Sequence, residues 1–231
     1  MLSKKFLARN NIYIKLLFIM IFCLSCINEV EIKEKTSIVT TESNRIGYGE
    51  FKTQIALDKV KFQNKTYKEI SDHLFTQLDD KMYFYWLDTP WDYSGISEVP
   101  KEGTIACGYF VTTLLRDLGF EIQRVKLAQN PSSVMINQLC QNIKRFYNFQ
   151  NFTNYLKNQP NKSIYILGLD YHTGFILKDS HGIYFFHSDY NNKKGVTKEK
   201  IEDSKALKDS KTFMIGNLTS NEKLLKKWLI K

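Results

Sequence analysis

Apolar residues recur every three or four positions through much of the first two thirds of the chain, a spacing typical of amphipathic helices. This pattern predicts helices over residues 66–82, 106–118 and about 131–149. A shorter helix is expected at 152–157. Gly119 follows the second of these helices, at the place where glycine commonly ends a helix.

The spacing of apolar residues changes in the last third of the chain. Short runs rich in β-branched and aromatic residues predict strands at 163–169, 172–177 and 182–187. A short polar segment, 178–181, separates the last two runs and predicts a β-hairpin. Helices followed by an antiparallel sheet indicate an α+β fold.

The remaining segments are expected to form connections and peripheral elements. Pro90, Gly95, Pro100 and Gly103 punctuate residues 89–103, which predicts a loop. The other expected elements are a strand or turn at 51–62, a strand at 121–127, a charged helix at 196–207, a strand at 211–218 and a helix at 221–230.

The N-terminal segment combines a basic region, an apolar run over residues 16–24, and the pair Ser25-Cys26. The run is too short to cross a hydrocarbon layer, which takes about 20 helical residues, so an export signal is expected. A small residue directly before cysteine resembles the bacterial lipoprotein signal, in which the cysteine carries lipid. Cys23 stands where leucine is usual, and simple secretion or an uncleaved anchor are the alternatives.

This resemblance divides the chain into three parts. Residues 1–25 are expected to be the signal peptide, 26–50 the lipidated Cys26 and a polar flexible tether, and 51–231 the folded domain. The expected location is the periplasmic or cell-surface face of a bacterial membrane, held there by lipid.

The formal charge is +9, from 33 Lys and Arg residues against 24 Asp and Glu residues. Four of the basic residues belong to the N-terminal signal, and the others are interspersed with acidic residues along the chain. No concentrated basic stripe is present, so nucleic acid is not an expected partner.

Cys107 lies at the start of the helix predicted at 106–118, where the helix dipole and free N–H groups favour a thiolate. His172 begins one predicted strand, and His187 ends the strand that pairs with it, so the two become spatial neighbours. A thiol, a base and a polar group that orients the base are the parts of an activated nucleophile. Gly108 leaves the backbone beside the thiol open to a substrate carbonyl.

Each of these residues also has a structural explanation. Cys107 is surrounded by apolar residues that suit a buried thiol, and export permits a disulfide with Cys140, which is itself expected to pack in the core. A metal site formed by Cys107, His172 and His187 lacks the short paired ligand spacing of structural zinc. No metal or cofactor is expected.

Three other polar residues are expected at the surface. His73 falls on an outer helix face, and His181 falls at the tip of the hairpin. Gln129 is expected in a surface turn, with an oxyanion-binding amide as the alternative.

A Cys-Gly-aromatic-Phe-Val helix start, a His-x-Gly-apolar strand and a strand ending in aromatic-His-Ser resemble the NlpC-type cell-wall cysteine peptidases. These enzymes have a papain-like fold, in which the helix that bears the nucleophile packs on an antiparallel sheet. The resemblance covers residues 91–190. It implies that Cys107 is the nucleophile, His172 the base and His187 the polar third member.

The same resemblance suggests residues that contact the substrate. Trp91 or Tyr93 corresponds to a loop aromatic near the nucleophile, and Gly108 and Ser188 are further candidates for substrate or oxyanion binding. The implied function is hydrolysis of amide bonds in peptidoglycan stem peptides. Acyl transfer by the same residues and a non-catalytic binding scaffold are the alternatives.

Overall fold

The computed structural model describes residues 46–191 and 194–230. The expected signal peptide, Cys26 and the tether as far as residue 45 lie outside the described residues. A compact unit begins at Tyr48, so the last three residues assigned to the tether belong to the first described helix. Within the described ranges, no helix has the length and hydrophobicity that a membrane crossing requires.

The first half of the domain is helical. Its helices are α2 (Tyr48–Lys61), α3 (Tyr67–Thr76), the π-helix η1 (Gln77–Met82), α4 (Tyr83–Trp86), α5 (Cys107–Asp117), α6 (Arg124–Ala128) and α7 (Ser132–Leu139). A capping box at Thr66 starts α3: the Thr66 hydroxyl accepts a hydrogen bond from the Glu69 N–H, and the Glu69 carboxylate accepts one from the Thr66 N–H.

An antiparallel sheet of six strands forms the second half, in the order β1-β6-β2-β3-β4-β5. Its strands are β1 (Gln141–Phe146), β2 (Ser163–Gly168), β3 (Thr173–Lys178), β4 (Ile183–Asp189), β5 (Gly195–Lys200) and β6 (Phe213–Asn217). Three helices accompany the strands: α8 (Phe149–Lys157), α9 (Lys205–Asp209) and α10 (Glu222–Ile230). The predicted α+β class is confirmed, including the β3–β4 hairpin.

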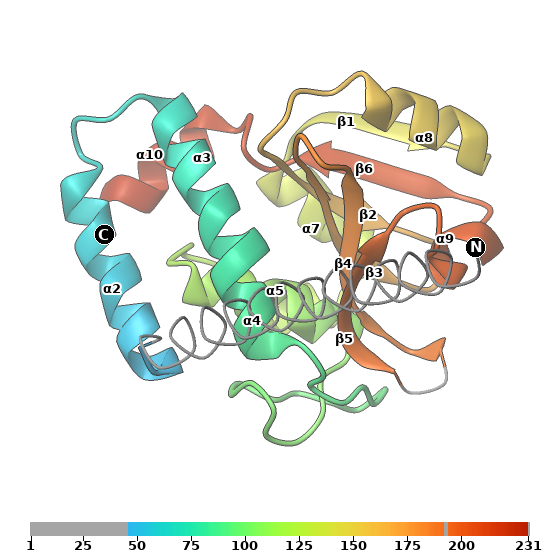
Figure 1. Cartoon of the computed structure of the whole chain (residues 1–231), viewed down its shortest axis with the longest axis horizontal. Helices are drawn as coiled ribbons and strands as arrows, with labels where there is room; N and C mark the ends of the chain where they lie inside the picture. Colours follow the sequence, from blue (N-terminus) through green and yellow to red (C-terminus); the bar gives the residue numbers. More distant parts are fainter. Residues whose placement is uncertain (1–45, 192–193, 231) are drawn as a thin grey trace, which may run out of the picture. The chain divides into compact units, whose positions relative to one another are not determined.

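Helices cover both faces of the sheet. Figure 1 shows α2, α3 and α10 grouped together on one side, with α8 and α9 by the strands at the other end of the view. The larger apolar core joins α2, α3, α5, α7 and α10 to one face of the sheet. The smaller core joins α8 and α9 to the opposite face.

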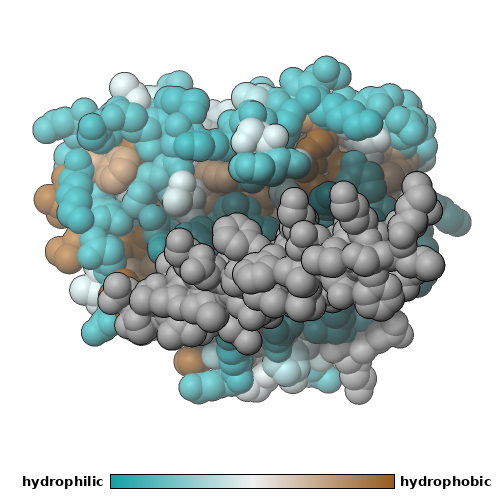
Figure 2. All heavy atoms as spheres, in the orientation of Figure 1, coloured by the Kyte–Doolittle hydropathy of each residue, from teal (hydrophilic) through white to brown (hydrophobic). Residues whose placement is uncertain are grey.

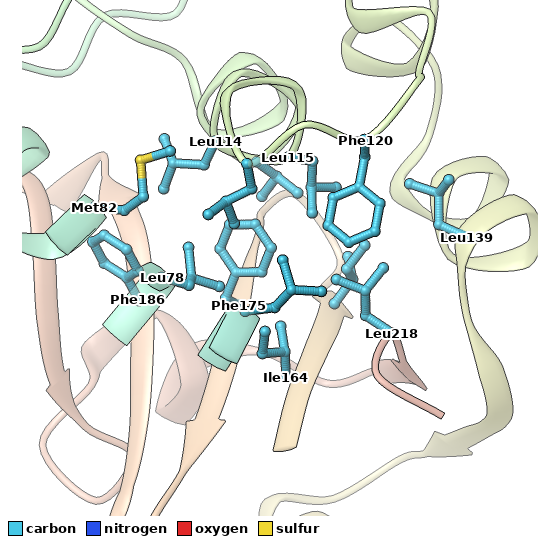
Figure 3. Packing of buried hydrophobic residues seen from close by; sticks show 14 of the residues in the cluster. Leu78, Met82, Leu114, Leu115, Phe120, Leu139, Ile164, Phe175, Phe186 and Leu218 are labelled. Atoms are coloured by element: carbon cyan, nitrogen blue, oxygen red, sulfur yellow. The ribbon is translucent and has the colours of Figure 1, made fainter. Parts of the chain in front are cut away.

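The larger core fixes the position of α5. Figure 3 shows Leu114 and Leu115 of this helix above Phe175 and Ile164 of the sheet. The Phe110 ring lies 5.0 Å from the ring of Phe186, with the planes nearly perpendicular. Such edge-to-face packing adds specificity to apolar burial, so the helix that carries Cys107 is held firmly on the sheet.

Gly119 ends α5 as the sequence predicts. Its φ is +87°, and the N–H groups of Gly119 and Phe120 donate to the carbonyls of Arg116 and Leu115. A left-handed glycine satisfies the last carbonyls of a helix in this way.

Among the coloured residues in Figure 2, hydrophilic ones predominate, and hydrophobic residues appear as separate groups between them. Single apolar residues at the surface are normal in folded proteins and indicate no particular function.

Four sequence predictions about secondary structure are wrong. Residues 51–62 lie mostly in α2 and are not a strand, and the strand expected at 121–127 is largely α6. The helix expected at 131–149 ends at Leu139, and β1 follows it. The helix expected at 196–207 is β5 followed by α9. In short segments such as these, tertiary contacts can override the secondary structure that the local sequence pattern favours.

His73 was expected on an exposed face and is not there. Its side chain is only 13% exposed and lies 3.3 Å from the Asp58 carboxylate. Phe62 and Trp228 also pack against its ring. His181, in contrast, is exposed at the hairpin tip as predicted.

Candidate active site

Cys107 is the first residue of α5, and a fixed loop leads into it. The Ala106 N–H donates to the Gly95 carbonyl, and the Ile105 N–H donates to the Pro90 carbonyl, both at 2.9 Å. The buried Ser188 hydroxyl donates to the Ile105 carbonyl at 2.7 Å. These bonds connect the loop to itself and to β4, so they determine where the thiol lies.

Ser188 therefore has a structural position. Its side chain is fully buried and its hydroxyl proton is used by Ile105, so it does not line the cleft that contains Cys107. Gly108 does line that cleft. A Cβ atom at Gly108 would lie 2.6 Å from the Ala128 carbonyl oxygen, so glycine allows α5 and α6 to approach closely at the site.

Three backbone N–H groups surround the Cys107 sulfur. They belong to Thr173, Gly108 and Cys107 itself, and they lower the pKa of the thiol. Burial has the larger effect and raises the pKa above its ordinary value of 9.0. The resting group is thus a protonated thiol, whereas the helix position alone had suggested a thiolate.

His172, His187 and Glu199 form a hydrogen-bonded chain. Nε2 of His172 lies 2.8 Å from Nδ1 of His187, and Nε2 of His187 lies 3.3 Å from Oε1 of Glu199. Both imidazoles are buried, His187 completely. Gly174 makes room for this chain, because a Cβ atom there would lie 2.7 Å from the Cβ of His187.

The charges along this chain follow from its surroundings. Burial and the neighbouring His187 lower the pKa of His172 well below 6.5, with Glu199 acting in the opposite direction. Burial alone would raise the pKa of Glu199, but the hydrogen bonds that its carboxylate accepts from His187, Ser204 and Lys194 lower it to about 2. At neutral pH the chain therefore begins with a neutral imidazole and ends with a carboxylate.

The direction of the hydrogen bonds defines which nitrogen of His172 is basic. An ionised carboxylate only accepts hydrogen bonds, so Nε2 of His187 carries the proton that points to Glu199. A neutral His187 then offers the lone pair of Nδ1 to His172, whose Nε2 carries the next proton. This order leaves Nδ1 of His172 unprotonated and able to accept a proton.

The structure brings the predicted thiol and base into the same cleft. Cys107 and His172 line two adjoining pockets, and the Thr173 N–H that contacts the sulfur belongs to the residue next to His172. Among the residues described, no hydrogen bond joins the Cys107 thiol to an imidazole, and the His172 ring has its hydrogen bond with His187. Catalytic hydrogen bonds are often long before substrate binds, so this geometry suits a resting site.

The two pockets differ in character. One has a volume of about 600 Å³ and is surrounded by the aromatic residues Trp91, Tyr93, Tyr109, Tyr171 and Tyr190. The other, of about 430 Å³, contains more polar residues, among them Ser132, Ser133, Arg145 and Asp170. Both volumes are in the range of ligand sites. Because both pockets include Cys107, the thiol lies where the two halves of the cleft meet.

The aromatic residues occupy different positions around the cleft. Trp91 packs on Tyr190, whose ring lies 5.1 Å from that of His172. Tyr93 and Tyr171 are 86% and 97% exposed and line both pockets. Gln129 also lines the aromatic pocket, where its amide donates to the Tyr109 hydroxyl at 3.1 Å.

Cys140 is separate from the site. Both Cys107 and Cys140 are free thiols, so the alternative disulfide is not formed. Cys140 is 4% exposed in the larger apolar core, as expected, and burial raises its pKa far above that of an ordinary thiol. It follows α7 directly, instead of lying in the middle of a longer helix.

A metal centre does not explain the predicted residues. In the described part of the chain, one group has metal-ligand proximity, and it consists of His187, Asp189 and Glu199 without Cys107 or His172. Its members already have partners: His187 contacts Glu199, and Asp189 accepts hydrogen bonds from Asn191.

Glu199 is the site residue that the sequence did not predict. It lies on β5, where a charged helix had been expected, and β5 pairs with the strand that carries His187. A strand assignment for residues 195–200 would have placed the carboxylate beside the histidine.

Comparisons with known proteins identify no relative of this chain. No family model matches this sequence, and no similar protein is found among curated sequences or solved structures. The resemblance to NlpC-type peptidases therefore stays a prediction from the sequence motifs.

Proposed function

We propose that this protein is a lipid-anchored cysteine hydrolase of the bacterial cell envelope that cleaves amide bonds, with peptidoglycan stem peptides as its substrates. The hydrogen-bonded chain from His172 through His187 to Glu199, in the cleft that contains Cys107, is the observation that carries this proposal. The helix that carries the thiol packs against an antiparallel sheet, which also supports a papain-like arrangement. The envelope location follows from the N-terminal signal pattern.

The first step is attack on the substrate carbonyl. Nδ1 of His172 accepts the Cys107 proton while the sulfur forms a bond to the carbonyl carbon. The N–H groups at the start of α5 stabilise the negative oxygen that develops. The imidazolium of His172 is stabilised through His187 by the Glu199 carboxylate, which keeps the proton on His172 and accepts none itself.

The second step releases the amine and regenerates the thiol. The carbon–nitrogen bond breaks as His172 returns its proton to the leaving nitrogen, which leaves an acyl group on Cys107. Water then attacks this thioester, His172 accepts the proton of the water, and the sulfur leaves and is protonated again. A neutral thiol and a neutral imidazole suit this order, because the base acts only when a substrate is present.

Substitution of the thiol tests the proposal. We expect Cys107→Ala to abolish the release of peptides from purified peptidoglycan, measured by mass spectrometry of the soluble fragments. Cys140→Ala is the matched control, because it removes the other described thiol and leaves the cleft intact. It is expected to retain the activity with some loss of stability, about 1 kcal/mol or more. Peptide release by Cys107→Ala at the wild-type rate would exclude the proposed chemistry.

A further inference from the structure

Arg145 is the single cationic side chain among the described residues that line the polar pocket beside Cys107. It comes from β1, where it is paired with Met214 of β6. The next residue, Phe146, packs against α8 in the smaller core, and successive side chains in a strand point to opposite faces. Arg145 therefore lies on the face shared by α7 and the cleft.

The guanidinium of Arg145 has no partner among the described residues. Two other arginines, Arg116 and Arg124, both pair with Glu98. No ion pair or side-chain hydrogen bond involves Arg145, although the pocket that it lines also contains a carboxylate. A guanidinium offers five donors in a planar arrangement that matches a carboxylate.

The carboxylate in this pocket belongs to Asp170 and is occupied elsewhere. It accepts hydrogen bonds from the hydroxyls of Thr212 and Ser210 and from the Lys211 N–H. These bonds lower the pKa of Asp170 and bind it to the segment before β6. Arg145 is left as the free charged donor of the polar pocket.

The aromatic pocket on the other side of Cys107 has no Asp, Glu, Lys or Arg residue in its described lining. Selection of a substrate by charge therefore falls to the polar pocket. We infer that Arg145 binds a carboxylate of the substrate, so that the enzyme prefers peptides with a free carboxylate at one fixed position from the cleaved bond. This inference rests on the proposed hydrolase function and names the class of peptide that it acts on.

A peptide set with matched charges provides the test. Neutral heptapeptides are compared with peptides in which Glu replaces Gln at each position in turn, and each peptide has either a free or an amidated C-terminus. Cleavage rates are measured by mass spectrometry for the wild-type protein and for Arg145→Gln, Arg145→Lys and Lys144→Gln. Lys144 is the matched control, because it is an exposed cation on the adjacent position of β1 and lines none of the described cleft pockets.

The wild-type protein is expected to cleave the best carboxylate peptide about 10–100 times faster than its neutral partner. Arg145→Gln should reduce this ratio to about 1, Arg145→Lys should restore part of it, and Lys144→Gln should leave it unchanged. A structural role for Arg145 would alter both rates together and leave the ratio as it is. A wild-type ratio near 1, or an unchanged ratio in Arg145→Gln, would overturn the inference and leave the hydrolase proposal intact.

A binding measurement separates the two proposals. If the wild-type protein cleaves no peptide, the hydrolase proposal fails for this peptide class, and binding of the same Glu and Gln peptides to Cys107→Ala is compared by calorimetry. Tighter binding of the Glu peptide, lost when Arg145→Gln is added, would support carboxylate recognition without catalysis. Equal binding of the two peptides would refute it.

Discussion

The buried chain of His172, His187 and Glu199 has a physical consequence for each of its members. His187 has no contact with water, so both of its ring nitrogens need partners, and it finds them in His172 and Glu199. Removal of the terminal carboxylate leaves the Nε2 proton of His187 without its acceptor. Because His187 also bonds His172, the loss of this acceptor should change the orientation and the proton affinity of the His172 ring as well.

Glu199→Gln tests this coupling. We expect kcat to fall about 100-fold or more, because the amide no longer fixes the tautomers of the two histidines. Since Glu199 raises the pKa of His172, the substitution should also shift the acid limb of the rate profile to lower pH.

The wild-type acid limb itself should lie well below pH 6.5, because His172 must be neutral to accept the thiol proton and its pKa is lowered. Lys194→Gln is the control: Lys194 pairs with the same carboxylate at 3.1 Å, but its side chain is 51% exposed, so little change is expected. An unchanged pH profile and kcat in Glu199→Gln would show that Glu199 has no part in the reaction.

At the scale of elements, the stability of α5, the helix that carries Cys107, depends on its C-terminal residue as well as on its packing in the core. Gly119 has a positive φ, and a Cβ atom there would also lie 2.7 Å from Cε of Lys59. Both effects oppose any larger residue at the end of α5.

Gly119→Ala is expected to lower the free energy of unfolding by about 1–2 kcal/mol, as measured by urea denaturation. The control is Gly49→Ala in α2, where a new Cβ atom meets no neighbour within 4 Å and φ is not positive. That substitution should have no effect or stabilise the protein by up to about 1 kcal/mol. Equal effects of the two substitutions would contradict the role assigned to the left-handed glycine.

Elements with strong apolar periodicity were predictable from the sequence, and the two edge strands were not. The pattern located α3, α5, α8 and α10 and the strands β2, β3, β4 and β6. β1 and β5 lie at the two edges of the sheet. Both contain charged residues at consecutive positions, and charged side chains are common in edge strands. Their sequences therefore show no alternation, and both were assigned to helices.

This difference decided which site residues could be predicted. Cys107 and His187 lie on strongly patterned elements, and His172 directly precedes another, β3, so the sequence placed the three residues near one another. Glu199 and Arg145 lie on the edge strands, and their positions depend on strand pairing with β4 and β6. Ser188 was assigned to the substrate because it follows His187, and only the tertiary structure shows that its hydroxyl bonds to Ile105.

At the scale of the whole domain, two apolar cores position the site. The larger core holds α5 on one face of the sheet, and the smaller core supports the opposite face, where Phe185 stacks on the His187 ring at 4.0 Å. The thiol and the histidine chain thus reach the cleft from different elements that pack on a shared sheet. Tertiary packing on this sheet therefore brings the nucleophile and the base together.

Detection of an acyl group on Cys107 is the most direct measurement of the proposed chemistry. The protein is mixed with a cleavable peptide, quenched with acid during turnover and digested, and the mass of the fragment that contains Cys107 is determined. We expect this fragment to gain the mass of the acyl half of the peptide, and we expect the gain to be absent in His172→Ala. Peptide cleavage without any added mass on Cys107, or an equal adduct in His172→Ala, would contradict catalysis by this thiol and this imidazole.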